Sequence, residues 1–180
     1  MTDRLPNKTI QVLKELFQQP NQYDVKVVHL VRDPRALVYS VVISAKWIKN
    51  HLDPSFPPEN VRRVCYPIVQ NLRLGLISPP PWLKNRFKVI RCEDLVLNTI
   101  NIAQDLYRFA GFDWPVSVQE WINGHMSHES KAAEFDPYSL HRNPSAVIDK
   151  WKNAPEAFIR AVEDVCGDLM DVLGYEKWTS

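Results

Sequence analysis

Glycine is scarce in this sequence: the 180 residues include five, and the first of them is Gly75. Loops that cradle phosphate groups with backbone N–H groups need glycine, because a side chain would keep the phosphate away from the backbone. No such loop can be drawn in the first 74 residues. The Walker pattern of nucleotide kinases is absent as well, which disfavours that class of protein.

Long apolar runs and an excess of one charge are also missing. No stretch approaches the roughly 18 consecutive apolar residues that span a bilayer, and the amino-terminal residues lack the apolar core of a signal peptide. The net charge of +1 argues against a nucleic-acid partner, since such proteins carry a clear basic excess. With 45% hydrophobic and 24% charged residues, residues 1–180 are expected to form one soluble domain.

Cysteine and histidine give no signal for a metal. The three cysteines, Cys65, Cys92 and Cys166, have no C-x-x-C spacing and allow one bridge at most. The pair His125 and His128 lacks a third ligand at a fixed spacing, so we expect no metal site. No set of residues resembles a known catalytic triad, and the catalytic residues stay unassigned.

The apolar pattern predicts an α/β protein with a parallel sheet. Strands are expected at 27–31 and 87–91, and helices at 9–19, 34–48, 59–76, 99–110, 116–123 and 155–173. Two strands are too few for an independent sheet. We therefore expect the sheet to be incomplete, with an amino-terminal strand absent.

The first strand and the helix after it hold the strongest functional signal. Arg32 falls at the carboxyl end of the strand, Pro34 begins the helix, and Ser40 follows about two turns later. Ligands of open α/β sheets bind at that edge, and an arginine fork beside a hydroxyl suits a phosphate dianion. The alternative is an ordinary turn in which Asp33 caps the helix.

Three segments carry a resemblance to a known family. They are Leu30-Val31-Arg32-Asp33-Pro34-Arg35-Ala36 with Ser40, Arg91-Cys92-Glu93-Asp94-Leu95, and Arg142-Asn143-Pro144-Ser145 followed by Lys150-Trp151. Together they resemble the sulfotransferases that use 3′-phosphoadenosine-5′-phosphosulfate (PAPS), and most closely the carbohydrate branch that sulfates galactose or N-acetylglucosamine. The resemblance implies a P-loop-like sulfotransferase fold in which Arg32, Ser40 and Arg142 hold the 3′-phosphate of PAPS. The Arg91 segment has a cysteine where the family usually has tyrosine, and we expect it to serve structure.

The resemblance also implies an acceptor glycan and residence in the Golgi lumen, with a membrane anchor only if a preceding segment supplies one. The family binds the 5′-phosphosulfate with a glycine-containing loop that would precede residue 27, and no glycine stands there. Two explanations stay open. The chain is the carboxyl-terminal part of a longer enzyme, which we favour, or a shortened relative that binds nucleotide or glycan without catalysis, with Lys46, Lys49, Arg62 and Arg63 as a basic rim.

Cys65 and Cys166 stand at positions that resemble the paired cysteines of luminal carbohydrate sulfotransferases. A bridge between them would join two helices, and we expect Cys92 to stay outside it. The alternative is that both are buried thiols, which are common in any protein core.

Overall fold

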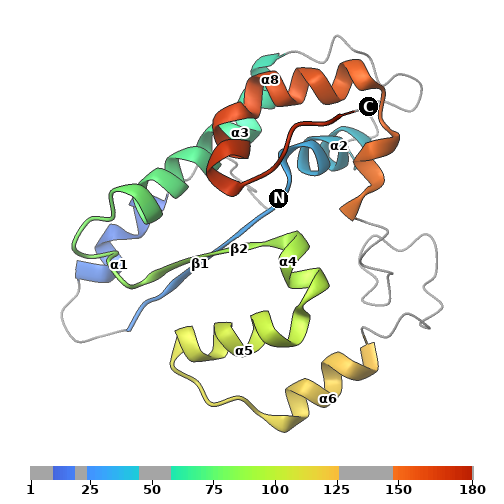
Figure 1. Cartoon of the computed structure of the whole chain (residues 1–180). Helices are drawn as coiled ribbons and strands as arrows, with labels where there is room; N and C mark the ends of the chain where they lie inside the picture. Colours follow the sequence, from blue (N-terminus) through green and yellow to red (C-terminus); the bar gives the residue numbers. More distant parts are fainter. Residues whose placement is uncertain (1–9, 19–23, 45–57, 126–147, 180) are drawn as a thin grey trace. The chain divides into compact units, whose positions relative to one another are not determined.

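The computed structural model describes residues 10–18, 24–44, 58–125 and 148–179, which belong to two compact units (Figure 1). The first unit combines the chain up to Arg91 with the chain from Trp151 onward, and the second unit is the stretch 92–150 between them. No helix among the described residues is long and apolar enough to cross a membrane.

The first unit contains a parallel pair of strands, β1 (Val27–Val31) and β2 (Phe87–Arg91). Val27 lies opposite Phe87 and Val31 opposite Arg91, so the two strands end at the same level. Both strands match their predicted ranges, but they are only partly buried: Val31 and Ile90 lie in the interior, whereas Val28 and Leu30 are exposed. The mixed helix and parallel-sheet architecture confirms the α/β class; in the described part of the chain the sheet has two strands.

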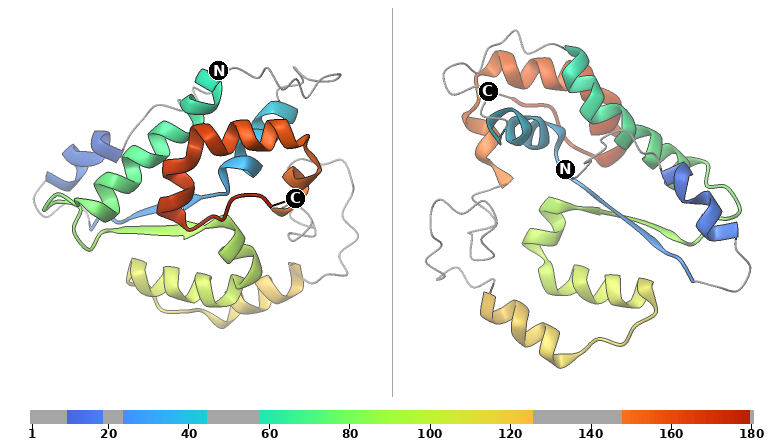
Figure 2. Two further views of the ribbon diagram at one scale, coloured as in Figure 1. Left: turned by 45° about the horizontal axis from the view of Figure 1, so that its top comes forward. Right: turned by 180° about the vertical axis from the view of Figure 1, so that it is seen from behind.

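Among the described residues, four α-helices belong to the first unit (Figures 1 and 2). They are α1 (Lys14–Gln18), which continues a 3-10 turn Ile10–Leu13, then α2 (Pro34–Ser44), α3 (Pro58–Leu72) and α8 (Glu156–Leu173). α8 packs against both α2 and α3. Apolar residues at helical spacing form the shared core, which includes Val38, Val61, Leu72, Phe158, Val162 and Leu169. The expected end of α2 at residue 48 lies outside the described residues.

A disulfide joins α3 to α8 through Cys65 and Cys166, whose Cα atoms are 5.7 Å apart. Both cysteines are buried in the core, and Cys92 is outside the bridge. The expected pairing is therefore confirmed, and the alternative of two buried thiols is wrong. The bridge fastens the helix that follows β1 and α2 to the last helix of the chain.

The end of α3 differs from the continuous helix predicted over 59–76. Arg73–Ile77 widens into a π-helical turn, and the N–H of Ser78 donates to the carbonyl of Arg73 at 2.9 Å. Gly75 lies directly against the ring of Phe87 on β2, and a Cβ atom at position 75 would overlap that ring. The wider turn brings the backbone to the sheet at the one residue without a side chain.

The second unit consists of α4 (Cys92–Leu97), α5 (Thr99–Ala110) and α6 (Val116–His125). α5 has its predicted bounds and ends at Gly111, whose φ of 83° closes the helix in the left-handed conformation. Tyr107 packs edge-on against Trp114 at 5.1 Å between ring centroids, which folds the connection back on α5. α4 was not predicted, because its six residues are too few to show a helical period.

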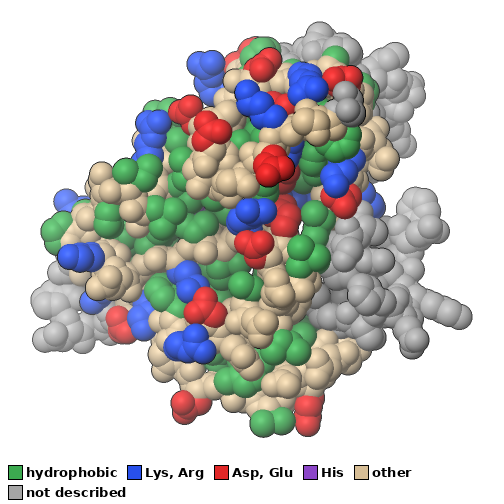
Figure 3. All heavy atoms as spheres, viewed as in Figure 1, with side chains coloured by type: hydrophobic (Ala, Val, Ile, Leu, Met, Phe, Trp, Pro, Cys, Tyr) green, Lys and Arg blue, Asp and Glu red, His purple; other side chains and the backbone are tan. Residues whose placement is uncertain are grey.

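Charged side chains of both signs are interspersed over the face of the molecule shown in Figure 3. That face has no large patch of a single charge, in keeping with the net charge of +1.

Candidate functional site

The turn from β1 to α2 places the predicted phosphate ligand at the carboxyl end of the sheet. Val31, the last residue of β1, is buried, and Arg32 follows it as a half-buried residue. The next three residues, Asp33, Pro34 and Arg35, are buried and begin α2. A rigid turn of this kind presents the arginine at the edge where ligands of α/β sheets bind.

Asp33 caps α2. Its Oδ1 atom accepts the backbone N–H of Arg35 at 2.8 Å, and its carbonyl oxygen accepts the N–H of Leu37 at 2.9 Å. The capping role that we weighed against a phosphate site is therefore confirmed for Asp33. It leaves the role of Arg32 open, because the cap uses the neighbouring side chain.

Ser40 lies on the exposed side of α2, two turns beyond Arg32. Ala36, one helical turn before Ser40, is buried in the core. Arg142 lies outside the described residues. The structure thus places Arg32 and Ser40 on one strand–turn–helix element, and their binding role stays a prediction.

Arg35 forms a buried ion network that the sequence did not reveal. Its guanidinium group donates to Asp33 Oδ2 at 2.7 Å through Nη2 and to Glu163 Oε1 at 2.7 Å through Nη1. The same Nη1 atom donates to the carbonyl of Glu176 at 2.9 Å, and the guanidinium stacks 4.1 Å from the ring centroid of Trp151.

Opposite charges decide the ionisation of this network. Burial by itself would lower the pKa of Arg35, but the hydrogen bonds and negative charges of Asp33 and Glu163 outweigh it and raise the pKa above its ordinary value. All three side chains are at least nine-tenths buried. The turn next to Arg32 is therefore fixed by paired charges out of contact with water.

The end of β2 is tied to the same carboxyl-terminal segment. Arg91 donates through Nη1 to the carbonyl of Leu173 at 3.2 Å, and its guanidinium lies 4.3 Å from the ring centroid of Tyr175. These contacts agree with the structural role expected of the Arg91 segment.

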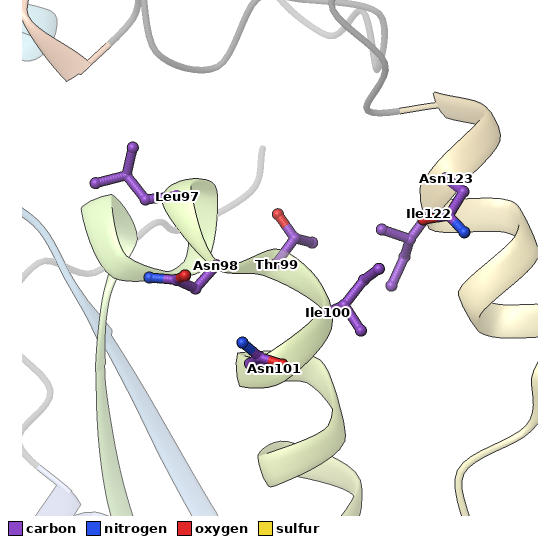
Figure 4. A pocket seen from close by; sticks show the side chains of 7 residues that line it. All are labelled: Leu97, Asn98, Thr99, Ile100, Asn101, Ile122 and Asn123. Atoms are coloured by element: carbon purple, nitrogen blue, oxygen red, sulfur yellow. The ribbon is translucent and has the colours of Figure 1, made fainter.

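The second unit holds a cavity of about 530 Å³ where α4 meets α5 (Figure 4). It is lined by the uncharged residues Leu97, Asn98, Thr99, Ile100, Asn101, Ile122 and Asn123. With no basic side chain in its lining, this cavity does not suit a phosphate group. No cluster of three metal-ligating side chains occurs in the part of the chain that the structure describes.

The sequence is similar to curated proteins over nearly its whole length. It is 32% identical over 182 residues to carbohydrate sulfotransferase 3 of Tetronarce californica, and the match covers 96% of this chain and 40% of the relative. Human carbohydrate sulfotransferase 3 is 30% identical over 183 residues, covering 94% and 37%, and mouse carbohydrate sulfotransferase 5 is 30% identical over 185 residues, covering 93% and 46%. The chain thus spans about 40% of the length of these relatives. No family model and no solved structure matches.

Proposed function

We propose that this chain, a homologue of the carbohydrate sulfotransferases, serves the transfer of a sulfuryl group from PAPS to a sugar hydroxyl of a glycan. The single observation that carries the proposal is the strand-end position of Arg32, on the segment through which the sequence resembles that family. The relatives are named as transferases, so the comparisons give no support to the non-catalytic alternative.

Arg32 and Ser40 suit one end of the nucleotide. A guanidinium group makes two parallel hydrogen bonds to a phosphate and retains its charge at every physiological pH. The exposed hydroxyl of Ser40 adds a neutral donor from the next helix. Arg142 is proposed as the third ligand of the 3′-phosphate, so that two guanidinium groups would balance a dianion.

The part of these residues in the reaction is positioning. PAPS would supply the sulfuryl group: the acceptor hydroxyl oxygen attacks the sulfur in line and loses its proton, while the bond from sulfur to the 5′-phosphate oxygen breaks and PAP leaves. Holding the 3′-phosphate far from the reacting sulfur fixes the donor without changing the charge at the sulfur. The proposal includes three further expectations: a P-loop-like sulfotransferase fold, an acceptor that contains galactose or N-acetylglucosamine, and residence in the Golgi lumen. The Cys65–Cys166 disulfide supports the last of them, because disulfides persist in oxidising compartments.

Titration with 3′-phosphoadenosine 5′-phosphate (PAP) tests the proposal by calorimetry. One charge-assisted phosphate contact is worth about 1.5–3 kcal/mol, so Arg32→Ala and Arg142→Ala should each weaken PAP binding by roughly tenfold or more. Arg73→Ala is the matched control, since Arg73 is an exposed arginine of the same unit that pairs with Asp168 and is not a proposed ligand. Unchanged PAP affinity in both Arg32→Ala and Arg142→Ala would refute the assignment.

A further inference from the structure

Residues 174–178 follow α8 and form what we call the C-terminal strap. The strap contacts side chains near both strand ends, the helix that carries Glu163, and Trp151. The strap begins at Gly174, whose φ of 70° ends α8 and turns the chain back. The N–H groups of Gly174 and Tyr175 donate to the carbonyls of Asp171 and Met170 on α8, and the contacts of the following residues are to side chains of the first unit.

The strap is fastened at two points to the Arg35 network. The N–H of Trp178 donates to Glu163 Oε1 at 2.7 Å, and the carbonyl of Glu176 accepts from Arg35 at 2.9 Å. Arg160 donates through Nη1 to the carbonyl of Trp178 at 2.6 Å. The ring of Trp178 packs edge-on against Trp151 at 5.5 Å between centroids. Arg35 and Trp178 therefore share Glu163 as a common acceptor.

A further contact reaches the second strand. Tyr175, the second residue of the strap, lies under the guanidinium of Arg91, the last residue of β2. Because β1 and β2 are parallel and end at the same level, the strap contacts the end of β2 and the turn after β1. In an α/β sheet this is the ligand-binding edge.

Arg32 lies between two fixed neighbours. Val31 is held in the strand and is 3% exposed, and Asp33 is held by its cap and its bonds to Arg35. The backbone of Arg32 therefore has the orientation that the Arg35 network sets, and that network is completed by the strap. We propose that the C-terminal strap is a positioning element of the nucleotide site, which holds Arg32 in the orientation that binds the 3′-phosphate.

The inference rests on the proposed function and is tested with the full chain. A variant that ends after Tyr175 removes the carbonyl of Glu176 and all contacts of Trp178. Glu163→Gln is a second variant, which keeps the side-chain shape and removes the charge. PAP affinity is measured by calorimetry for each variant, alone and combined with Arg32→Ala, together with the melting temperature.

We expect the strap variants to weaken PAP binding about 3- to 10-fold in the parent chain. When Arg32 is already replaced by alanine, the strap variants should lower PAP affinity by less than about twofold, because the strap then has no Arg32 side chain to position. Leu169→Ala, in the core on the same helix, is the control for stability alone: it should lower the melting temperature and leave PAP affinity within about twofold.

The outcomes separate the two proposals. If Arg32→Ala leaves PAP affinity unchanged, the proposed function fails and this inference falls with it. If Arg32→Ala weakens binding but the strap variants have no effect, or an effect of equal size in both backgrounds, the inference alone is overturned. Should Glu163→Gln fail to fold, Arg160→Met is the substitute, because it removes the hydrogen bond to the carbonyl of Trp178 and the Arg160 side chain is 42% exposed. Its effect on PAP affinity is likewise compared with and without Arg32→Ala.

Discussion

Removal of the Cys65–Cys166 disulfide should destabilise the first unit by a large fraction of its stability. The double variant Cys65→Ala, Cys166→Ala opens a loop whose ends are 101 residues apart in the sequence. The bridge stabilises the fold by lowering the conformational entropy of the unfolded chain. For a loop of this length, its removal should lower the free energy of unfolding by about 4.7 kcal/mol. The loop contains the whole second unit; if that unit stays compact, the value falls by less than about 1 kcal/mol, because the dependence on length is logarithmic.

Thermal unfolding followed by near-ultraviolet circular dichroism measures the effect on the first unit, which contains the Trp151–Trp178 pair. For a protein of this size, 4–5 kcal/mol corresponds to a decrease of about 10–20 °C in the melting temperature. A reductant should lower the melting temperature of the parent chain by a similar amount and leave the double variant unchanged.

Cys92→Ala is the matched control, because Cys92 is outside the bridge. The melting temperature of Cys92→Ala should be close to that of the parent chain, and a reductant should lower it by as much as it lowers that of the parent. A double variant that melts within about 3 °C of the parent, with no response of the parent to reductant, would refute the reasoning. In that case the contacts of α3 with α8 alone would hold the two helices together.

Three further predictions concern single residues and the chain as a whole. In urea unfolding, Gly75→Ala should destabilise the chain by about 1–3 kcal/mol because its Cβ overlaps Phe87, whereas Gly167→Ala, in open space on α8, should stabilise it by up to about 1 kcal/mol; the opposite signs are the test. Burial lowers the pKa of His29, so the unfolded chain takes up the proton first as the pH falls below about 6.5; stability should decrease on acidification from pH 7, and the slope should flatten in His29→Leu. The 180 residues alone should transfer no labelled sulfate from PAPS to a galactose or N-acetylglucosamine acceptor, since no glycine loop precedes Arg32 to stabilise the transferred group; measurable transfer would contradict this.

Local patterns predicted the regular elements well. The bounds of β1, β2 and α5 agree with their predicted ranges because each shows one clear period and ends at a residue that stops it, such as Gly111 after α5. The π-helical turn was missed because it depends on a packing contact, between Gly75 and Phe87, that no local pattern contains.

The candidate site was predicted only in part, for a similar reason. Arg32 and the cap at Asp33 are neighbours in the sequence, and their roles can be inferred from the turn that they form. The partners of Arg35 stand 128 and 141 positions away, at Glu163 and Glu176. An arginine next to a proline turn gives no sign of which distant carboxylate it will meet. The one available hint was that Glu163 stands at helical spacing with the apolar residues Ile159, Cys166 and Met170.

The split of the first unit has a consequence for biosynthesis. The core around Val38, Val61 and Leu72 packs against α8, the last helix of the chain, while residues 92–150 form a unit of their own in between. During translation the inserted unit emerges complete, whereas its host still lacks a helix. If oxidation begins during synthesis, Cys65 and Cys92 are the thiols of residues 1–165 that can react before Cys166 leaves the ribosome, and a bridge between them would give the nascent chain the wrong connectivity. The correct disulfide therefore requires that Cys65 stays reduced until the next 101 residues have been synthesised.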